Sequence, residues 1–147
     1  MAVKWTDDQK KVMETRGKDI LVSAAAGSGK TAVLVERIVQ RITDPSDPVS
    51  VNELLVVTFT RAAAAEMKER LSAALEKRME DAPEDPVLVR QAALLQQAHI
   101  STIDSFCQWL VRQYFFLLDV DPDLRIADEG EDRLLREDCL DQMLSEA

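Results

Sequence analysis

The sequence predicts an α/β fold in which a parallel sheet is flanked by helices, and two observations support this. Short apolar runs rich in β-branched residues, DILVSA, LLVVTFT and the weaker HISTI, are typical of strands buried on both faces of a parallel sheet. A stretch with helical character follows each run, and this alternation indicates a layered α/β sheet. The expected strands cover residues 19–24, 54–60 and 99–103, and the expected helices cover residues 30–42, 61–79 and 104–118.

The helix expected at residues 61–79 has the clearest pattern. Its apolar residues recur at every fourth position, which predicts one buried face, and Glu66 is spaced to pair with Arg70 across one turn. The apolar residues are Met67, Leu71, Leu75 and Met79. Two further helices are expected at residues 87–97 and 131–144, the second of them amphipathic, and loops rich in Pro and Asp separate the elements.

Length and composition indicate one ordinary globular domain. The chain has 147 residues, of which 46% are hydrophobic and 31% charged, with a formal net charge of -9. That charge is concentrated at the end of the chain. Residues 119–147 carry eleven acidic residues against three arginines, whereas residues 1–118 carry sixteen acidic residues against fifteen basic ones. The overall acidity therefore does not exclude a nucleic-acid partner for the surface built by the first 118 residues.

The cysteines, the histidine and the apolar stretches exclude several classes of protein. Cys107 and Cys139 lie far apart without a C-x-x-C motif, and the single His99 completes no set of metal ligands. No membrane span is expected, because Arg112 and Asp119 interrupt the longest apolar stretch. We therefore expect a reduced, metal-free cytoplasmic chain.

The segment AAAGSGKT, between an expected strand and an expected helix, has the pattern of a phosphate-binding loop. In such a loop the backbone N–H groups point at phosphates, Lys30 reaches the β- and γ-phosphates, and the Thr31 hydroxyl ligates Mg²⁺. Gly27 and Gly29 supply the backbone freedom that the loop needs. The strict pattern has its first glycine where this chain has Ala24, and we expect the methyl group to be tolerated if φ stays negative there.

Gln9 has two possible roles. Thr6 and Gln9 have the spacing of a capping box, in which each side chain accepts a hydrogen bond from the other's backbone N–H at the start of a helix. Alternatively, the Gln9 carboxamide reads the edge of an adenine by donating and accepting a hydrogen bond at once.

Two strand ends carry a similar group of side chains. Thr58, Phe59, Thr60 and Arg61 end one expected strand before an alanine-rich helix, and Ser101, Thr102, Ser105 and Phe106 end the next one. Hydroxyls, an arginine and a helix N-terminus are groups that contact phosphates, and a phenylalanine stacks on bases. Each end alone also fits a capped helix, with Asp104 or Ser105 as the cap and Phe106 in the core. Two such ends beside a phosphate loop predict a surface for a single strand of nucleic acid.

The order TDDQ, AAAGSGKT, TFTRAAAAEMKERL and STIDSFC resembles the start of a superfamily 1 helicase of the UvrD/RecB kind. EMKERL, TIDSFC and LRIADEGE are most similar to the AddA subunits of bacterial AddAB helicase-nucleases. The resemblance implies a partial RecA-like P-loop domain at residues 1–118 that runs into the start of an inserted helical subdomain at residues 119–147. It also accounts for Ala24, because members of this family often have alanine there.

The resemblance further implies roles for individual residues. Those expected to bind ATP and its Mg²⁺ are Gln9, Ala24, Ala25, Ala26, Gly27, Ser28, Gly29, Lys30 and Thr31, with Lys30 and Thr31 catalytic and Thr31 on the ion. Those expected to contact single-stranded DNA are Thr58, Phe59, Thr60, Arg61, Thr102, Ser105 and Phe106. Arg61 departs from the asparagine common in the family. The implied partners are DNA and a second, AddB-like helicase-nuclease subunit.

The carboxylate pair that ATP hydrolysis requires after a hydrophobic strand is missing. ADEGED resembles such a pair, but the preceding DPDLRIA is interrupted by Asp123 and Arg125, so we expect Asp128 to cap the final helix instead. We therefore expect an N-terminal piece of a much larger protein that binds nucleotide and turns over little of it. Its open sheet edge predicts self-association. The alternatives are a UvrD-type helicase without a nuclease, a small P-loop kinase and a non-enzymatic interaction module.

Overall fold

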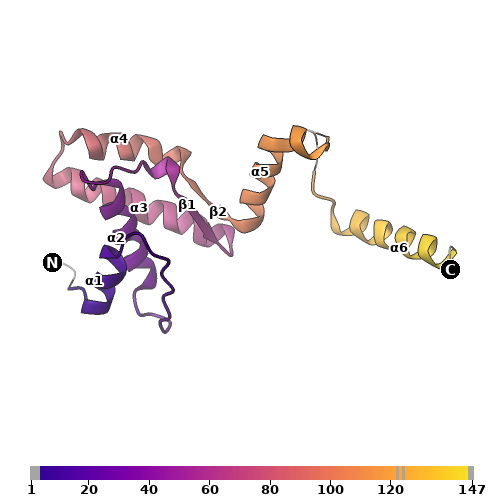
Figure 1. Cartoon of the computed structure of the whole chain (residues 1–147), viewed down its shortest axis with the longest axis horizontal. Coiled ribbons are helices and arrows are strands. Elements are labelled where there is room, and N and C mark those ends of the chain that lie inside the picture. Colours follow the sequence, from indigo (N-terminus) through magenta and orange to yellow (C-terminus); the bar gives the residue numbers. More distant parts are fainter. Residues whose placement is uncertain (1–3, 122, 124, 146–147) are drawn as a thin grey trace. The chain divides into compact units, whose positions relative to one another are not determined.

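The structure, a computed structural model, describes residues 4–121, 123 and 125–145. Its contacts divide the chain into two compact units, Met1–Phe106 and Cys107–Ala147, which we call the N-terminal and C-terminal units (Figure 1). The elements of the N-terminal unit are α1 (Asp7–Glu14), α2 (Lys30–Ile42), η1 (Val51–Glu53), β1 (Leu55–Thr58), α3 (Arg61–Asp81), α4 (Pro86–Leu94), η2 (Leu95–Gln97) and β2 (His99–Thr102). They are followed by α5 (Ile103–Leu118) and α6 (Glu129–Ser145).

A small parallel sheet joins the second and third predicted strands. β1 and β2 pair in register from Leu55 with His99 to Thr58 with Thr102. Parallel pairing requires a long crossover, and the helices α3 and α4 supply it. The two strands therefore end at the same edge of the sheet, which places the polar strand ends next to each other.

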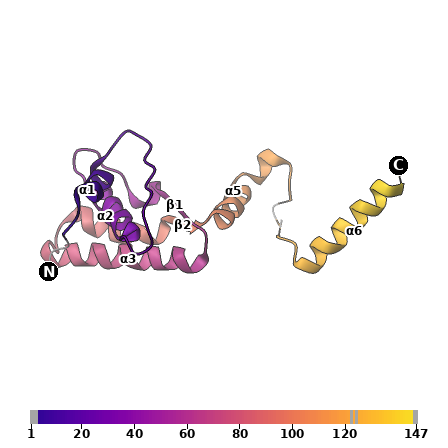
Figure 2. The same ribbon diagram turned by 90° about the horizontal axis from the view of Figure 1, so that it is seen from below.

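The first predicted strand, residues 19–24, is wrong for this structure. That segment is irregular, and Figure 2 shows the connection between α1 and α2 as a long loop without a strand. Leu21 is 98% exposed, and Ile20 and Val22 are also exposed. A strand with two apolar faces needs neighbours on both edges and cover on both faces, and the described part of the chain supplies neither.

The hydrophobic core lies on one side of the sheet, where α3 packs against α2, α4 and both strands. The predicted buried face of α3 is confirmed: Leu71 and Leu75 are 0% exposed, and Met67 is also buried. The prediction that the strands are covered on both faces is wrong. Val56 packs against the core, whereas its neighbours Leu55 and Val57 are exposed on the opposite face.

The C-terminal unit contains most of α5 and all of α6. α5 bends at Tyr114, whose backbone is not helical (φ -121°, ψ 21°). α6 begins with a capping box in which Asp128 Oδ1 accepts from the Glu131 N–H at 2.9 Å, so the expected role of Asp128 is confirmed. None of the described α6 side chains is buried, although the sequence predicts an amphipathic helix. No helix in the described residues has the length and apolar character to cross a membrane.

Candidate nucleotide-binding site

The glycine loop before α2 has the backbone conformation that its sequence predicts. Gly27 (φ 76°) and Gly29 (φ 82°) both take the left-handed conformation, and Gly29 is the N-cap of α2. A side chain is strained in that conformation, which explains glycine at both positions. Among the described residues Asp119 is the only non-glycine with a positive φ, so Ala24 meets the condition under which alanine is tolerated.

The N-terminus of α2 has no side-chain cap, unlike those of α1, α3 and α4. Side chains of Thr6, Thr60 and Asp85 cap α1, α3 and α4, whereas no side chain caps α2 and its first turn holds no acidic residue. No capping side chain therefore competes with a ligand for the N–H groups of Lys30 and Thr31. These groups lie at the positive end of a thirteen-residue helix. Such a helix start favours an anion such as phosphate.

The Lys30 side chain binds backbone carbonyls of its own loop. Its Nζ donates to the carbonyl oxygens of Ala24 at 2.6 Å and Ala25 at 2.8 Å. An ammonium has three donors, so one remains for a further acceptor while both carbonyls stay bound. Thr31 is the next residue of α2 and is exposed, as its expected role on a metal ion requires.

Gln9 combines capping with a contact to the loop. Its Oε1 accepts from the Thr6 N–H at 2.9 Å and Thr6 Oγ1 accepts from the Gln9 N–H at 3.3 Å, which confirms the capping box. Gln9 Nε2 also donates to the Ser28 carbonyl at 3.3 Å. A carboxamide has two N–H donors and an oxygen with two lone pairs, so one donor and one acceptor remain. The capping and base-reading roles are therefore compatible.

A cavity of about 530 Å³ lies between α1, the loop and α2. This volume is typical of small-molecule sites. Its walls combine apolar side chains with polar residues, which are Thr6, Asp8, Gln9, Ser23, Ser28 and Lys30. The apolar residues at its walls are Val12, Val22, Val33 and Leu34. Apolar walls with an amide on one side and an ammonium on another suit a ligand with a flat base and an anionic tail.

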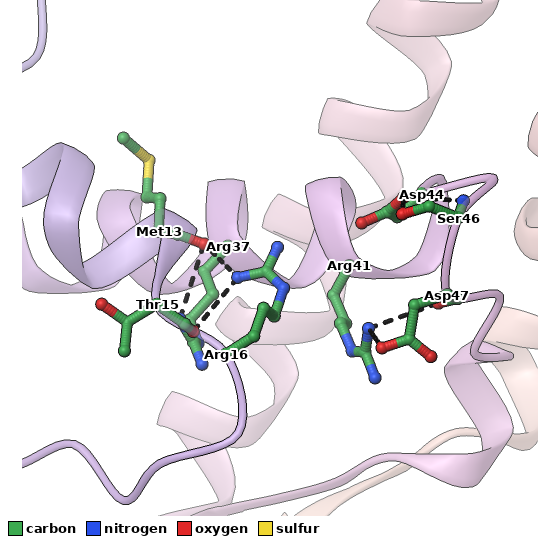
Figure 3. A network of polar contacts seen from close by, with 8 residues as sticks. All are labelled: Met13, Thr15, Arg16, Arg37, Arg41, Asp44, Ser46 and Asp47. Atoms are coloured by element: carbon green, nitrogen blue, oxygen red, sulfur yellow. Dashed lines mark hydrogen bonds and ion pairs between the residues drawn. The ribbon is translucent and has the colours of Figure 1, made fainter.

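Arg37, a residue that the sequence did not single out, joins α1 to α2. Arg37 of α2 donates to the carbonyl of Val12. Figure 3 shows that Arg37 also donates to the Thr15 carbonyl at 2.9 Å, and that Arg16 donates to the Met13 carbonyl at 2.5 Å. Burial, then the nearby Arg16 and Arg41, lowers the pKa of the Arg37 guanidinium, which nonetheless stays protonated at neutral pH. The available signal was an arginine two helical turns after Lys30.

The first predicted strand end exposes an aromatic ring. Phe59 follows β1 and is 95% exposed, and Arg61 at the start of α3 is also exposed. The hydroxyls are engaged locally: Thr58 Oγ1 donates to the Thr60 carbonyl at 2.9 Å, and Thr60 Oγ1 accepts from the Ala63 N–H at 3.1 Å. Phe59 and Arg61 are thus the groups of this end that are open to a ligand.

The second strand end is more enclosed. Thr102, opposite Thr58 in the sheet, is buried, and its Oγ1 donates to Ser105 Oγ at 2.8 Å and accepts from the Ser105 N–H at 3.2 Å. The residue that caps α5 is therefore Thr102, not Asp104 or Ser105 as the sequence suggested. Phe106 is partly buried, with its ring edge-on to His99 at 6.2 Å between centroids. The structure brings the two strand ends together, and their contact with DNA stays a prediction.

A family model matches a range of residues that includes the loop, α2 and both strand ends. Residues 5–146 match the model described as UvrD/REP helicase N-terminal domain, which is nearly the whole chain. The chain belongs to the UvrD/REP helicase family. This membership confirms the resemblance drawn from the order of its motifs.

Similar proteins of the UvrD/REP family are AddA-type subunits of an ATP-dependent helicase/nuclease. The chain is 57% identical over 143 residues to the one from Moorella thermoacetica and 57% identical over 142 residues to the one from Bacillus licheniformis. It is 55% identical over 143 residues to the one from Geobacillus thermodenitrificans. Each match covers 97% of this chain but only 10–12% of the relative, so the chain spans about a tenth of the length of these curated relatives.

Proposed function

We propose that this chain binds ATP as the N-terminal part of a RecA-like P-loop domain, with residues 1–118 in that domain and residues 119–147 at the start of an inserted helical subdomain. The observation that carries the proposal is the loop itself. Two left-handed glycines lead into a helix N-terminus that no side chain caps, and Lys30 lies inside the loop. In this proposal Lys30 and the amides of the loop hold the phosphates, and Gln9 contacts the adenine.

The residues around the loop fit a magnesium ion that arrives with the nucleotide. No group of three or more His, Cys, Asp or Glu side chains able to hold a metal occurs in the described part of the chain. Mg²⁺ is often bound through substrate phosphates and few protein ligands, and the Thr31 hydroxyl at the start of α2 would be one of them. The ion would neutralise charge on the β- and γ-phosphates.

For the whole protein we propose an ATP-dependent DNA helicase with a nuclease elsewhere in the chain, acting in the cytoplasm on DNA double-strand breaks. The name of the relatives supports a helicase/nuclease over a UvrD-type helicase without a nuclease. In this proposal a second, AddB-like subunit is the partner, and single-stranded DNA crosses the edge formed by Thr58 and Thr102. The carboxylates for hydrolysis would come from the rest of the protein.

The proposal is tested by nucleotide binding to the purified chain. Titration with ATP and Mg²⁺, followed by calorimetry, should give a measurable dissociation constant with little or no release of phosphate. Lys30→Ala should raise the dissociation constant at least ten-fold, because it removes a charge-assisted contact with the phosphates. Lys18→Ala, in the connection between α1 and the loop, is the control for loss of one positive charge and should leave binding unchanged.

Three outcomes would contradict the proposal. Steady ATP hydrolysis by the chain alone would show that the hydrolytic groups lie within these 147 residues. Phosphoryl transfer to a nucleoside or metabolite would support a small P-loop kinase. Unchanged ATP affinity in Lys30→Ala, with the fold retained, would favour an interaction module in which the loop has only a structural role.

A further inference from the structure

The attachment of α1 to the rest of the N-terminal unit is narrow. α1 has eight residues and packs chiefly against α2. Met13 of α1 and Val33 of α2 are buried, but neither belongs to the main core cluster between α2, α3 and α4. Because Gln9 and Val12 form one wall of the cavity, the position of this short helix determines the shape of the candidate site.

Among the described residues, Arg37 is the side chain whose hydrogen bonds join α1 to α2. Its Nη1 donates to the carbonyls of Val12, Met13 (3.5 Å) and Thr15 (2.9 Å), which lie in the last turn and at the C-cap of α1. The contacts with Met13 and Thr15 are drawn in Figure 3. Carbonyls at a helix end lack helical partners and carry partial negative charge, so a guanidinium binds them well. Arg16 contacts Met13 and Thr15 as well, but it follows directly after α1 in the chain and cannot tie α1 to α2.

The same helix carries Arg37 and Lys30. The two residues are seven positions apart in α2, so they lie about two turns and about 10 Å apart along one face. One end of α2 therefore meets the loop, and the middle of α2 holds the end of α1. Through α1, Arg37 is connected to Gln9, whose Nε2 returns to the loop at Ser28.

We propose that Arg37 is a positioning residue for nucleotide binding, which holds α1 so that the Gln9 carboxamide can meet the base. The inference rests on the proposed function of the loop and deepens it. Arg37 touches no part of the loop itself among the contacts of the described residues. Its removal should weaken recognition of the base and leave the grip on the triphosphate unchanged.

The test compares two ligands on the full chain. ATP engages both ends of the site, whereas inorganic tripolyphosphate engages the loop alone. Arg37→Met keeps an unbranched apolar stem and removes the donors, and it should lower ATP affinity about ten-fold while tripolyphosphate affinity stays within about two-fold. Lys30→Ala should weaken both ligands. The matched control is Arg41→Met, which removes an arginine one turn further along α2 that pairs with Asp47 instead.

A double variant separates positioning from a general loss of structure. If Arg37 acts through Gln9, Gln9→Ala combined with Arg37→Met should lose no more ATP affinity than Gln9→Ala alone. Additive losses, or equal losses for both ligands, would overturn the inference. If Arg37→Met has no cooperative thermal transition, Arg37→Lys replaces it, and the expected result is a smaller loss for ATP with the same unchanged tripolyphosphate affinity. A wild-type chain that binds neither ligand would refute the proposed function itself.

Discussion

At the scale of residues, Gln9 shows how one side chain serves both structure and a site. Its amide caps α1 through Thr6 and reaches the loop at Ser28, and half of its hydrogen-bonding capacity remains. The sequence could not decide between a cap and a base reader, because the same glutamine carboxamide can fill either role. The structure makes the two roles compatible, since different donors and lone pairs serve each.

The exposed ring of Phe59 allows its proposed contact with DNA to be tested separately from its effect on stability. Its ring is 95% exposed, so Phe59→Ala should change the free energy of unfolding by less than about 0.5 kcal/mol. If the ring stacks on a base, the same variant should lose about 1–3 kcal/mol of binding to single-stranded DNA. Fluorescence anisotropy with a labelled oligonucleotide measures the binding, and thermal unfolding measures the stability.

Leu21→Ala is the matched control for Phe59→Ala, because Leu21 is apolar and almost fully exposed like Phe59 but belongs to the connection between α1 and α2, not to a strand end. This variant should change neither DNA binding nor stability in this chain. An equal loss of DNA affinity in both variants would point to non-specific apolar contact. Unchanged affinity in Phe59→Ala would remove Phe59 from the proposed DNA surface.

At the level of elements, the sequence predicts where two helices begin. α2 begins at Lys30 as predicted, and α3 begins at Arg61 after its cap Thr60. These starts were predictable because caps and left-handed glycines act over three or four residues of sequence. The first strand was not predictable in the same way, because a strand requires hydrogen-bond partners that its own residues cannot supply.

The start of α6 should be sensitive to acid. A hydrogen bond from Arg125, then one from the Asp128 N–H, lowers the pKa of Glu131 from 4.5 to about 2. A carboxyl whose pKa falls on folding stabilises the folded form above its unfolded pKa and loses that contribution as pH falls through the folded one. The contacts of ionised Glu131 should therefore stabilise the start of α6 at pH values above the ordinary pKa of 4.5. This stabilisation should be lost as the pH falls towards about 2.

Carbon-13 chemical shifts of the side-chain carboxyl groups measure this titration in the full chain. Arg125→Gln should move the Glu131 midpoint upward, towards its ordinary value, because the strongest partner is lost. Arg136→Gln removes an arginine of the same unit that pairs with Asp132 and should leave Glu131 unchanged. A midpoint near 4.5 in the unaltered chain would contradict the pairing at this helix start.

At the scale of the whole molecule, the sheet of the N-terminal unit is covered on one face only. Leu55 and Val57 are exposed on its other face, and the apolar segment at residues 19–24 is exposed as well. Exposed apolar sheet surface of this kind normally marks an interface. The chain spans about a tenth of its relatives' length, and in the proposed RecA-like domain the remaining strands and helices would cover this surface.

Hydrogen exchange tests that interpretation. In this chain the amides of residues 19–24 should exchange rapidly, because no strand pairs with them. In a protein of the relatives' length that contains this chain, the same amides should become protected as the segment enters the sheet. The paired residues Leu55–Thr58 serve as the internal reference and should be more protected than residues 19–24 in this chain. Rapid exchange of residues 19–24 in the longer protein would contradict the proposal.

Local features of this protein could be predicted from its amino-acid sequence. The glycine loop, the start and end of α2 and the buried face of α3 follow from patterns within a few neighbouring residues. The three-dimensional structure was needed to show which strands pair, that Thr102 is buried, and that Arg37 joins α1 to α2. The physical reason is that these features depend on contacts between residues far apart in the chain, which local periodicity and capping rules do not specify.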